Sequence, residues 1–276
     1  MSDFNDDFMA PDDERRFGGL RRLYGEQDYQ CLRRAHIAVV GLGGVGSWVV
    51  EALARSGVAA LTLIDLDQVA ESNINRQVQA LGSTVGMAKV EALRQRILDI
   101  HPNCKVTLIE EFVDEQNWPG LLLGREGELH GLVDACDQVR AKACLAAWAL
   151  ERRLPFVSVG AAGGKRMPHL MGIEDLAEIT HDPLLASLRQ RLRKQYGAKR
   201  QGKMGVACVF SREPVHRPTA PEGQACEVDG SLNCHGYGSS VAVTASFGMA
   251  AAAALLKILF DNLKKPLARE LKVGLK

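Results

Sequence analysis

The sequence predicts an α/β fold: a Rossmann-like, doubly wound and mainly parallel sheet, with helices on both faces and long loops over the active face. Two observations support this. Short apolar runs alternate with amphipathic helical patterns, and a glycine-rich turn joins the first run to the first helix. The runs are 36–40, 60–64, 105–110, 129–133 and 155–159, and the helical patterns span about 45–56, 86–101 and 138–152. We expect one domain over residues 1–276, with 1–14 as a disordered acidic tail.

The first run leads into a turn whose glycines are typical of a phosphate-binding loop. These are Gly41, Gly43, Gly44 and Gly46, and Ser47 follows at the start of the helix. One glycine permits the sharp turn, one lets the backbone approach a phosphate, and one lets helix and strand pack closely. The free amides at the helix start then attract negative charge. The turn therefore predicts a nucleotide site.

The second run, 60–64, ends at an acidic residue with the spacing of a ribose ligand. Asp65 follows the glycine turn by roughly 20 residues, as in dinucleotide-binding folds. A polar segment, 71–77, comes next and contains Arg76. A hydride-transfer enzyme has no need of this arginine, whereas an enzyme that handles a triphosphate does.

A lysine opens the helix predicted over 86–101. Val90, Leu93 and Ile97 have the spacing of a buried helical face, which leaves Lys89 on the polar side. Its ammonium could reach a triphosphate as a point charge. A solvated surface lysine is the alternative.

The run 129–133 ends in two carboxylates, Asp134 and Asp137, at the edge where open α/β sheets bind ligands. Magnesium takes one or two carboxylates and keeps several waters, so Asp137 is the predicted metal ligand. Asp134 either supports that site or caps the helix that begins near Gln138.

The region after Gly160 combines a flexible glycine crossing, 160–164, with predicted long loops over 197–238. Between them, 184–200 reads as an amphipathic helix with a basic face, which is either simply solvated or contacts RNA phosphates. Its cations are Arg189, Arg191, Arg193 and Lys194, followed by Lys199, Arg200 and Lys203; a second basic set is Lys257, Lys264, Lys265, Arg269, Lys272 and Lys276. The uncharged stretch 236–256 is rich in small residues, which predicts a helix buried against the sheet or a subunit partner rather than a membrane span.

Composition points to a reduced, cytoplasmic protein. The formal net charge is +1, so a polyanionic partner would have to be held by local patches. The seven cysteines include no C-x-x-C pair of a zinc site. Cys208 is expected to be a packing residue, and the dipeptide Cys234-His235 is the one candidate for an activated thiol.

Together these motifs resemble the ubiquitin-activating-enzyme-like superfamily, whose members adenylate a carboxylate with ATP. They are Gly41–Ser47, Asp65-Leu-Asp67, Ser72-Asn73-Ile-Asn-Arg76-Gln77, Lys89 and Asp134-Ala-Cys-Asp137. The resemblance implies that the loop glycines, Ser47, Asp65, Asp67, Asn73 and Gln77 bind ATP, that Arg76 and Lys89 contact its phosphates, and that Asp137 holds Mg²⁺. It also implies a homodimer in which Arg16 enters the partner's site.

Further stretches, among them Arg16-Phe-Gly-Gly19, Arg22-Leu-Tyr-Gly25 and Val206–Glu213, resemble the tRNA threonylcarbamoyladenosine dehydratase branch over about Arg16 to Lys257. The resemblance implies that ATP activates the threonyl carboxylate of the modified adenosine, pyrophosphate leaves, and an internal nucleophile displaces AMP to close a ring. It leaves open a monovalent-cation requirement and a cysteine desulfurase or sulfur-acceptor partner.

Three other functions stay open at this point. The first is adenylation of a ubiquitin-like sulfur carrier, which the missing zinc pairs disfavour. The second is an NAD-dependent oxidoreductase, which would leave Arg76 and Lys89 without a function. The third is a non-enzymatic tRNA-binding or sulfur-relay scaffold.

Overall fold

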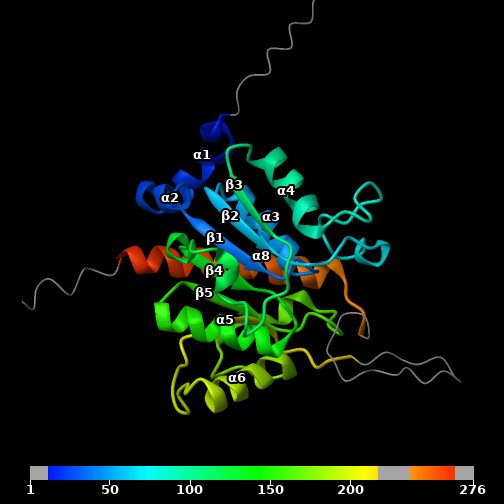
Figure 1. The fold of residues 1–276 in the computed structure, drawn as a ribbon, viewed down its shortest axis with the longest axis vertical. Helices are drawn as coiled ribbons and strands as arrows, with labels where there is room; N and C mark the ends of the chain where they lie inside the picture. The colour runs from blue at the N-terminus through cyan, green and yellow to red at the C-terminus, as the bar shows by residue number, and fades with distance from the viewer. Residues whose placement is uncertain (1–11, 217–236, 265–276) are drawn as a thin grey trace, which may run out of the picture.

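The computed structural model describes residues 12–216 and 237–264 of the chain (Figure 1). The strands are β1 (His36–Val40), β2 (Ala60–Ile64), β3 (Lys105–Ile109), β4 (Gly131–Asp134), β5 (Phe156–Val159), β6 (Met171–Asp175) and β7 (Ala207–Ser211). The α-helices are α1 (Asp13–Tyr24), α2 (Glu26–Leu32), α3 (Gly46–Arg55), α4 (Lys89–Ile100), α5 (Val139–Arg152), α6 (Pro183–Gln195) and α8 (Val241–Lys264). Short 3₁₀ turns occur at Glu71–Asn73, Gly120–Leu122, Glu126–Glu128 and Pro168–Leu170.

The sheet confirms the doubly wound, mainly parallel architecture. Its order is β3-β2-β1-β4-β5-β7-β6, and only β6 runs antiparallel, against β7. The chain moves outward from β1 to β3 and then returns to place β4 on the other side of β1. This reversal leaves a crevice at the carboxyl ends of β1 and β4.

The expectation of loops throughout 197–238 is wrong at β7. Ala207–Ser211 forms a strand parallel to β5, and its Cys208 and Val209 are fully buried. Glycines and polar residues on both sides hid this short apolar run, and it is strand because β5 and β6 offer partners on either edge. Residues 217–236 of the predicted loop lie outside the described residues.

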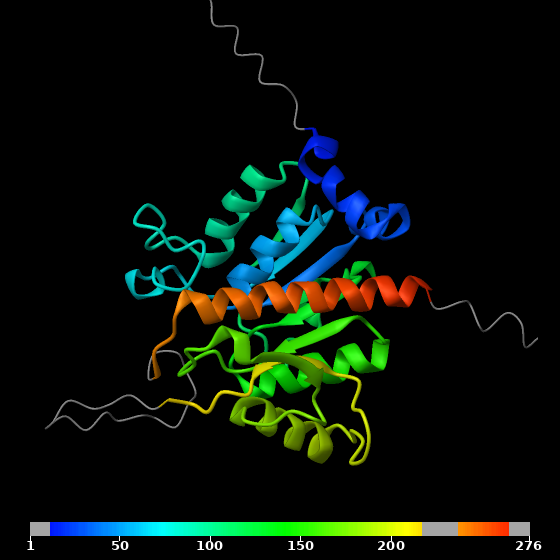
Figure 2. The same cartoon turned by 180° about the vertical axis from the view of Figure 1, so that it is seen from behind.

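Side chains alternate between two apolar layers, one on each face of the sheet. On β1, Ile37 and Val39 join the core under α3, α4 and α8, whereas Ala38 and Val40 join the core under α5 and α6. Figure 2 shows α8 crossing the sheet on one face, and α5 and α6 lie on the other face, toward the viewer in Figure 1. Both faces are thus covered, which explains why the central strands β1, β4 and β5 are buried along their whole length.

Helix α8 confirms the expectation of a helix buried against the sheet over much of 236–256. It packs on α3 and contacts β4, β5 and β7, and its Val243, Phe247 and Leu255 are fully buried. Val241–Asn262 is also long and apolar enough to span a membrane, and it is the one such helix in the described part of the chain. Because 61% of its most apolar window is buried inside the protein, its composition is accounted for by core packing.

The acidic N-terminal segment is shorter than predicted. Asp12 caps α1 by accepting hydrogen bonds from the backbone N–H of Glu14 at 2.9 Å and of Arg15 at 3.2 Å. Asp13 and Glu14 occupy the first turn, where the helix dipole favours negative charge. The prediction of a disordered tail is therefore wrong for residues 12–14, and residues 1–11 lie outside the described residues.

Candidate active site

A cleft opens at the carboxyl ends of β1 and β4, with an empty volume of about 1140 Å³ that includes space open to solvent. It brings together most of the predicted nucleotide residues: Gly41, Gly43, Gly44, Asp65, Asp67, Arg76, Gln77, Lys89 and Asp137. The remaining lining comes mainly from 111–113, from 135–138 and from the glycine crossing 160–163. The crossing predicted as flexible thus forms one wall of the cleft.

The sharp turn, the close packing of helix on strand and the approach of a ligand each depend on a different loop glycine. Gly41 has φ of +83°, and a Cβ there would lie 2.7 Å from the backbone nitrogen of Cys136. A Cβ on Gly46 would lie 1.7 Å from the carbonyl oxygen of Gly41, so only glycine allows α3 to start this close to β1. A Cβ on Gly43 would meet nothing within 4 Å, so this backbone is open to a ligand.

Two aspartates and a lysine form the wall that follows β2. Asp65 accepts hydrogen bonds from the backbone N–H of Leu42 at 2.6 Å and of Asp67 at 2.8 Å, and burial raises its pKa. The Nζ of Lys89 lies 2.6 Å from Asp67 Oδ2 and 3.9 Å from Asp65 Oδ1. Lys89 is only 5% exposed, which excludes the solvated surface lysine.

Arg76 has a buried donor without a partner. Its Nη1 donates to the carbonyl of Ser72 at 2.6 Å and to Asn75 Oδ1 at 2.9 Å. Its Nε makes no hydrogen bond, although the side chain is 8% exposed and lines the cleft beside Gly44. A buried donor of this kind is costly unless a ligand satisfies it. The geometry suits an anion.

Two residues that the sequence analysis missed hold the backbone of Arg76. Trp48 Nε1 and Thr244 Oγ1 donate to its carbonyl oxygen at 3.0 and 3.1 Å, and Thr244 also lines the cleft. A threonine in the uncharged first part of α8 was the available signal, but the carbonyl to which it donates is 168 residues away in the chain.

The two carboxylates after β4 have different environments. Asp137 is exposed at the cleft and has no hydrogen-bond or ionic partner among the described residues. Asp134 is fully buried and pairs with Lys142 and Ser158. The capping alternative for Asp134 is wrong, because the N-cap of α5 is Gln138 and makes no side-chain bond. The single free carboxylate of Asp137 suits a magnesium ion whose other ligands are phosphate and water oxygens.

Gly46, Ser47 and Asn73 support the cleft without lining it. Ser47 is fully buried, and its Oγ accepts a 3.4 Å hydrogen bond from the backbone N–H of Val78. Asn73 Oδ1 accepts from the backbone N–H of Ala70 at 3.1 Å. These side chains shape the loops that carry the ligand-facing groups.

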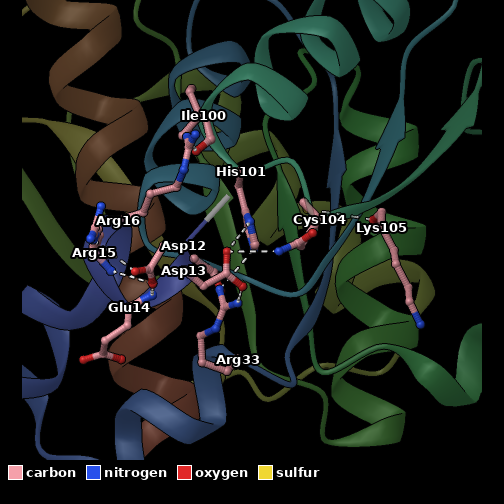
Figure 3. A network of polar contacts seen from close by, with 12 residues as sticks. Asp12, Asp13, Glu14, Arg15, Arg16, Arg33, Ile100, His101, Cys104 and Lys105 are labelled. Atoms are coloured by element: carbon pink, nitrogen blue, oxygen red, sulfur yellow. Dashed lines mark hydrogen bonds and ion pairs between the residues drawn. The ribbon is translucent and has the colours of Figure 1, made fainter. Parts of the chain in front are cut away.

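Arg16 is not among the residues that line the cleft of its own chain, and Figure 3 shows it beside Ile100. Its Nη1 donates to the carbonyls of Asp99 at 3.2 Å and Ile100 at 2.8 Å, at the carboxyl end of α4. Its predicted entry into a partner's site requires a second copy and stays a prediction.

The described cysteines offer no activated nucleophile. Cys208 is fully buried, and burial raises the pKa of its thiol. Cys136 lines the cleft, but burial and the neighbouring carboxylate of Asp134 raise its pKa well above the ordinary value. Cys234 and His235 lie outside the described residues.

The predicted basic face lies largely on α6, which begins at the cleft with Leu184. Some of its arginines are already engaged: Arg189 donates to the carbonyls of Leu176 and Ile179, and Arg191 pairs with Glu115. Lys194, Lys199, Arg200 and Lys203 are exposed, and their side chains contact no acidic group among the described residues. Of the second basic set, Lys257 pairs with Asp261, and the side chains from Lys264 onward lie outside the described residues.

Comparison with known proteins gives a consistent result. Residues 18–273 match the model of the ThiF family. The chain is 43% identical over 252 residues to a tRNA threonylcarbamoyladenosine dehydratase of Escherichia coli K12, covering 88% of this chain and 92% of the relative. It is 41% identical over 252 residues to the Haemophilus influenzae protein of the same name, covering 90% and 95%.

A solved structure shares the fold over nearly the whole chain. It is the crystal structure of E. coli tRNA N6-threonylcarbamoyladenosine dehydratase, TcdA, in complex with ATP. The TM-score is 0.81 at 41% identity, and the match covers 92% of this chain and 97% of the other.

Proposed function

Because the chain belongs to the ThiF family, we propose that it is an ATP-dependent enzyme that dehydrates threonylcarbamoyladenosine in tRNA to a cyclic product. The observation that carries this is the near full-length similarity to dehydratases, combined with a cleft whose free Arg76 donor, Lys89 and open Gly43 backbone suit phosphates. The near full-length similarity favours the dehydratase over the sulfur-carrier and scaffold alternatives, and the phosphate-suited cleft favours it over the oxidoreductase.

The reaction divides into two displacements. The threonyl carboxylate attacks the α-phosphorus of ATP, which forms a mixed anhydride with AMP and expels pyrophosphate. A nucleophile within the same nucleoside then attacks the activated carbonyl and expels AMP. The nucleoside loses one water in net terms, and no enzyme thiol is needed, in agreement with the buried state of Cys208.

The residues of this chain bind and orient the reactants. The Gly43 backbone, the first amides of α3 and the guanidinium of Arg76 would bind the phosphates of ATP. Lys89, oriented by Asp67, offsets the charge of the departing pyrophosphate. Asp65 uses its remaining acceptor positions for ribose hydroxyls.

We propose Mg²⁺ at Asp137, where it would neutralise phosphate charge. We also propose cytoplasmic location, homodimerisation and tRNA contacts through the exposed cations after α6. We further propose a monovalent-cation requirement and a cysteine desulfurase or sulfur-acceptor partner. Turnover compared in potassium and in choline chloride tests the first, and size-exclusion chromatography with light scattering tests the dimer.

The decisive experiment incubates the protein with ATP, magnesium and tRNA that contains threonylcarbamoyladenosine. Mass spectrometry of the digested nucleosides should show loss of one water from that nucleoside, with AMP formed in equal amount. An unchanged nucleoside in the presence of folded, ATP-binding protein would refute the proposed function. Pyrophosphate release that depends on a carrier protein would then favour sulfur-carrier adenylation.

A further inference from the structure

A fully enclosed ion pair lies beneath the loop that carries Asp137. Asp134 ends β4 and Lys142 lies in the first turns of α5; Asp134 Oδ2 and Lys142 Nζ are 3.0 Å apart, and both side chains are 0% exposed. Ser158 of β5 donates to the same oxygen at 2.6 Å and accepts from Lys142 at 3.2 Å. The three side chains, which we name the β4–α5 cluster, join two strands and a helix.

The other carboxylate oxygen of Asp134 faces the cleft loop. Asp134 Oδ1 accepts from the backbone N–H of Cys136 at 3.2 Å and from its thiol at 3.0 Å. The same loop rests against Gly41, where a Cβ would meet the backbone of Cys136. The Asp134 carboxylate therefore fixes the backbone immediately before Asp137.

Stability alone does not account for such a pair. Removing two charges from water costs several kcal/mol, and a well-packed apolar pair of similar volume is often equally stable or more stable. Burial is the largest single influence and opposes the charge on Lys142, but the carboxylate of Asp134, together with Cys136 and Cys208, outweighs it and raises the lysine pKa. Charges kept in so costly a place are better explained by the geometry they impose.

We propose that the β4–α5 cluster positions Asp137 for the metal that accompanies ATP. Lys142 and Ser158 hold one oxygen of Asp134, so that the other oxygen stays aligned with the Cys136 amide. Lys142, Ser158 and Asp134 are positioning residues, since none of them lines the cleft. The inference rests on the proposed function, in which Asp137 binds Mg²⁺.

Two charge-free double variants test this. Asp134→Asn with Lys142→Met keeps an oxygen that can accept from Cys136 N–H and an amide that can donate to Ser158. Asp134→Leu with Lys142→Met has equal charge and similar volume but lacks that acceptor. Melting temperatures establish folding, calorimetry measures how ATP binding depends on magnesium, and nucleoside mass spectrometry gives the magnesium concentration for half-maximal turnover.

We expect the Asn/Met variant to stay within about threefold of the wild type in magnesium dependence and the Leu/Met variant to need roughly 10- to 100-fold more magnesium, the range found when an outer partner of a metal ligand is lost. At saturating magnesium the Leu/Met variant should recover most of its kcat, which a general loss of structure would not allow. If both variants need the same magnesium concentration, whether that of the wild type or a higher one, the proposal is overturned.

A milder variant covers the case in which Leu/Met does not fold. Ser158→Ala removes one hydrogen bond to Asp134 and should raise the magnesium requirement about tenfold, at the lower end of that range, and a requirement within about threefold of the wild type would overturn the proposal. The calorimetric readout needs no tRNA. A wild type without dehydratase activity would therefore refute the proposed function while the positioning inference is still tested.

Discussion

The charged residues at the two edges of the sheet differ in how many hydrogen-bond partners they find within their own chain. At the carboxyl edge, Arg76 has an unpaired Nε and Asp137 has no partner among the described residues. At the amino edge, Arg33 and Arg16 are bonded to groups of their own chain (Figure 3). Unpaired polar atoms also occur away from the cleft, at His101 Nδ1 and Arg191 Nε, so an open donor indicates the site only where it belongs to a residue that lines the cleft.

At the amino edge, Arg33 is bonded to several groups of its own chain, although the neighbouring His101 Nδ1 is buried without a hydrogen-bond partner. Arg33 donates to the carbonyl of Gly57 at 2.8 Å and to His101 Nε2 at 3.1 Å, pairs with Asp13, and lies 5.2 Å from the centre of the Phe17 ring. Phe17 in turn packs edge-on against His101 at 4.7 Å. These contacts dock α1 on the end of α4.

The largest expected effect comes from removing the two cations that line the cleft. Arg76→Ala and Lys89→Ala should each lower kcat/KM by about 100- to 1,000-fold, because each removes a preorganised charge aimed at the phosphates. Folding should persist, since Trp48 and Thr244 still hold the backbone at position 76. Nucleoside mass spectrometry measures the rate, and calorimetry measures ATP binding.

Arg55→Ala is the matched control for these cation variants. Arg55 is 59% exposed and pairs with Glu51, which keeps Arg96 as a second partner. It should turn over at the wild-type rate. Near-normal rates in both cleft variants would show that the open donors do not mark the site.

A pair of glycine variants separates folding from ligand approach within one loop. Gly46→Ala should destabilise the protein by about 3 kcal/mol or more, because the new Cβ overlaps the Gly41 carbonyl. Gly43→Ala should change stability by less than about 0.5 kcal/mol, since its Cβ points into open space. It should nevertheless weaken ATP binding about tenfold or more by blocking the backbone. Equal effects of the two variants on stability would contradict this division of tasks.

Substitution of Arg16 tests whether an arginine bonded within its own chain at the amino edge has only a structural role. If it acts as a cap on α4, Arg16→Ala should cost about 1 kcal/mol, at the lower end for charged hydrogen bonds because the side chain is exposed, and leave turnover within about threefold. A loss of activity that is recovered on mixing with Lys89→Ala protein would instead place Arg16 in a second copy's site. Only a mixed dimer combines the two intact residues in one site.

The sequence predicted the cleft well because its signals are local. Glycine spacing, an acid at the end of β2 and an acid after β4 all lie next to strands whose carboxyl ends must meet in a parallel sheet. The first five strands accordingly appear within a few residues of the predicted ranges. The fold class and the family are confirmed.

The missed features depend on contacts between distant segments. Thr244 reaches Arg76 from the far end of the chain, and Lys142 pairs with Asp134 only because α5 packs on β4. In the sequence, Lys142 is one cation on a helix with mixed polarity. Strand β7 has a short apolar run without periodicity, and its neighbours in the sheet decide its conformation.

The smallest expected effect concerns pH and the amino edge. Burial, followed by the charge of Arg33, lowers the pKa of His101, and Asp13 opposes the shift only in part. Neutral His101 accepts a hydrogen bond from Arg33, and protonation removes that acceptor. The unfolded chain therefore binds more protons than the folded chain once the pH falls below about 6.5, so stability should decrease from there down to the lowered pKa of His101.

His101→Gln keeps an acceptor for Arg33 but does not titrate, so it should flatten the fall in melting temperature between about pH 7.5 and 5.5. Part of the slope should persist, because burial also lowers the pKa of His36 at the same edge. Calorimetric melting curves of both proteins across this range measure the difference. A slope unchanged by the substitution would mean that protonation of His101 does not affect the stability of the protein.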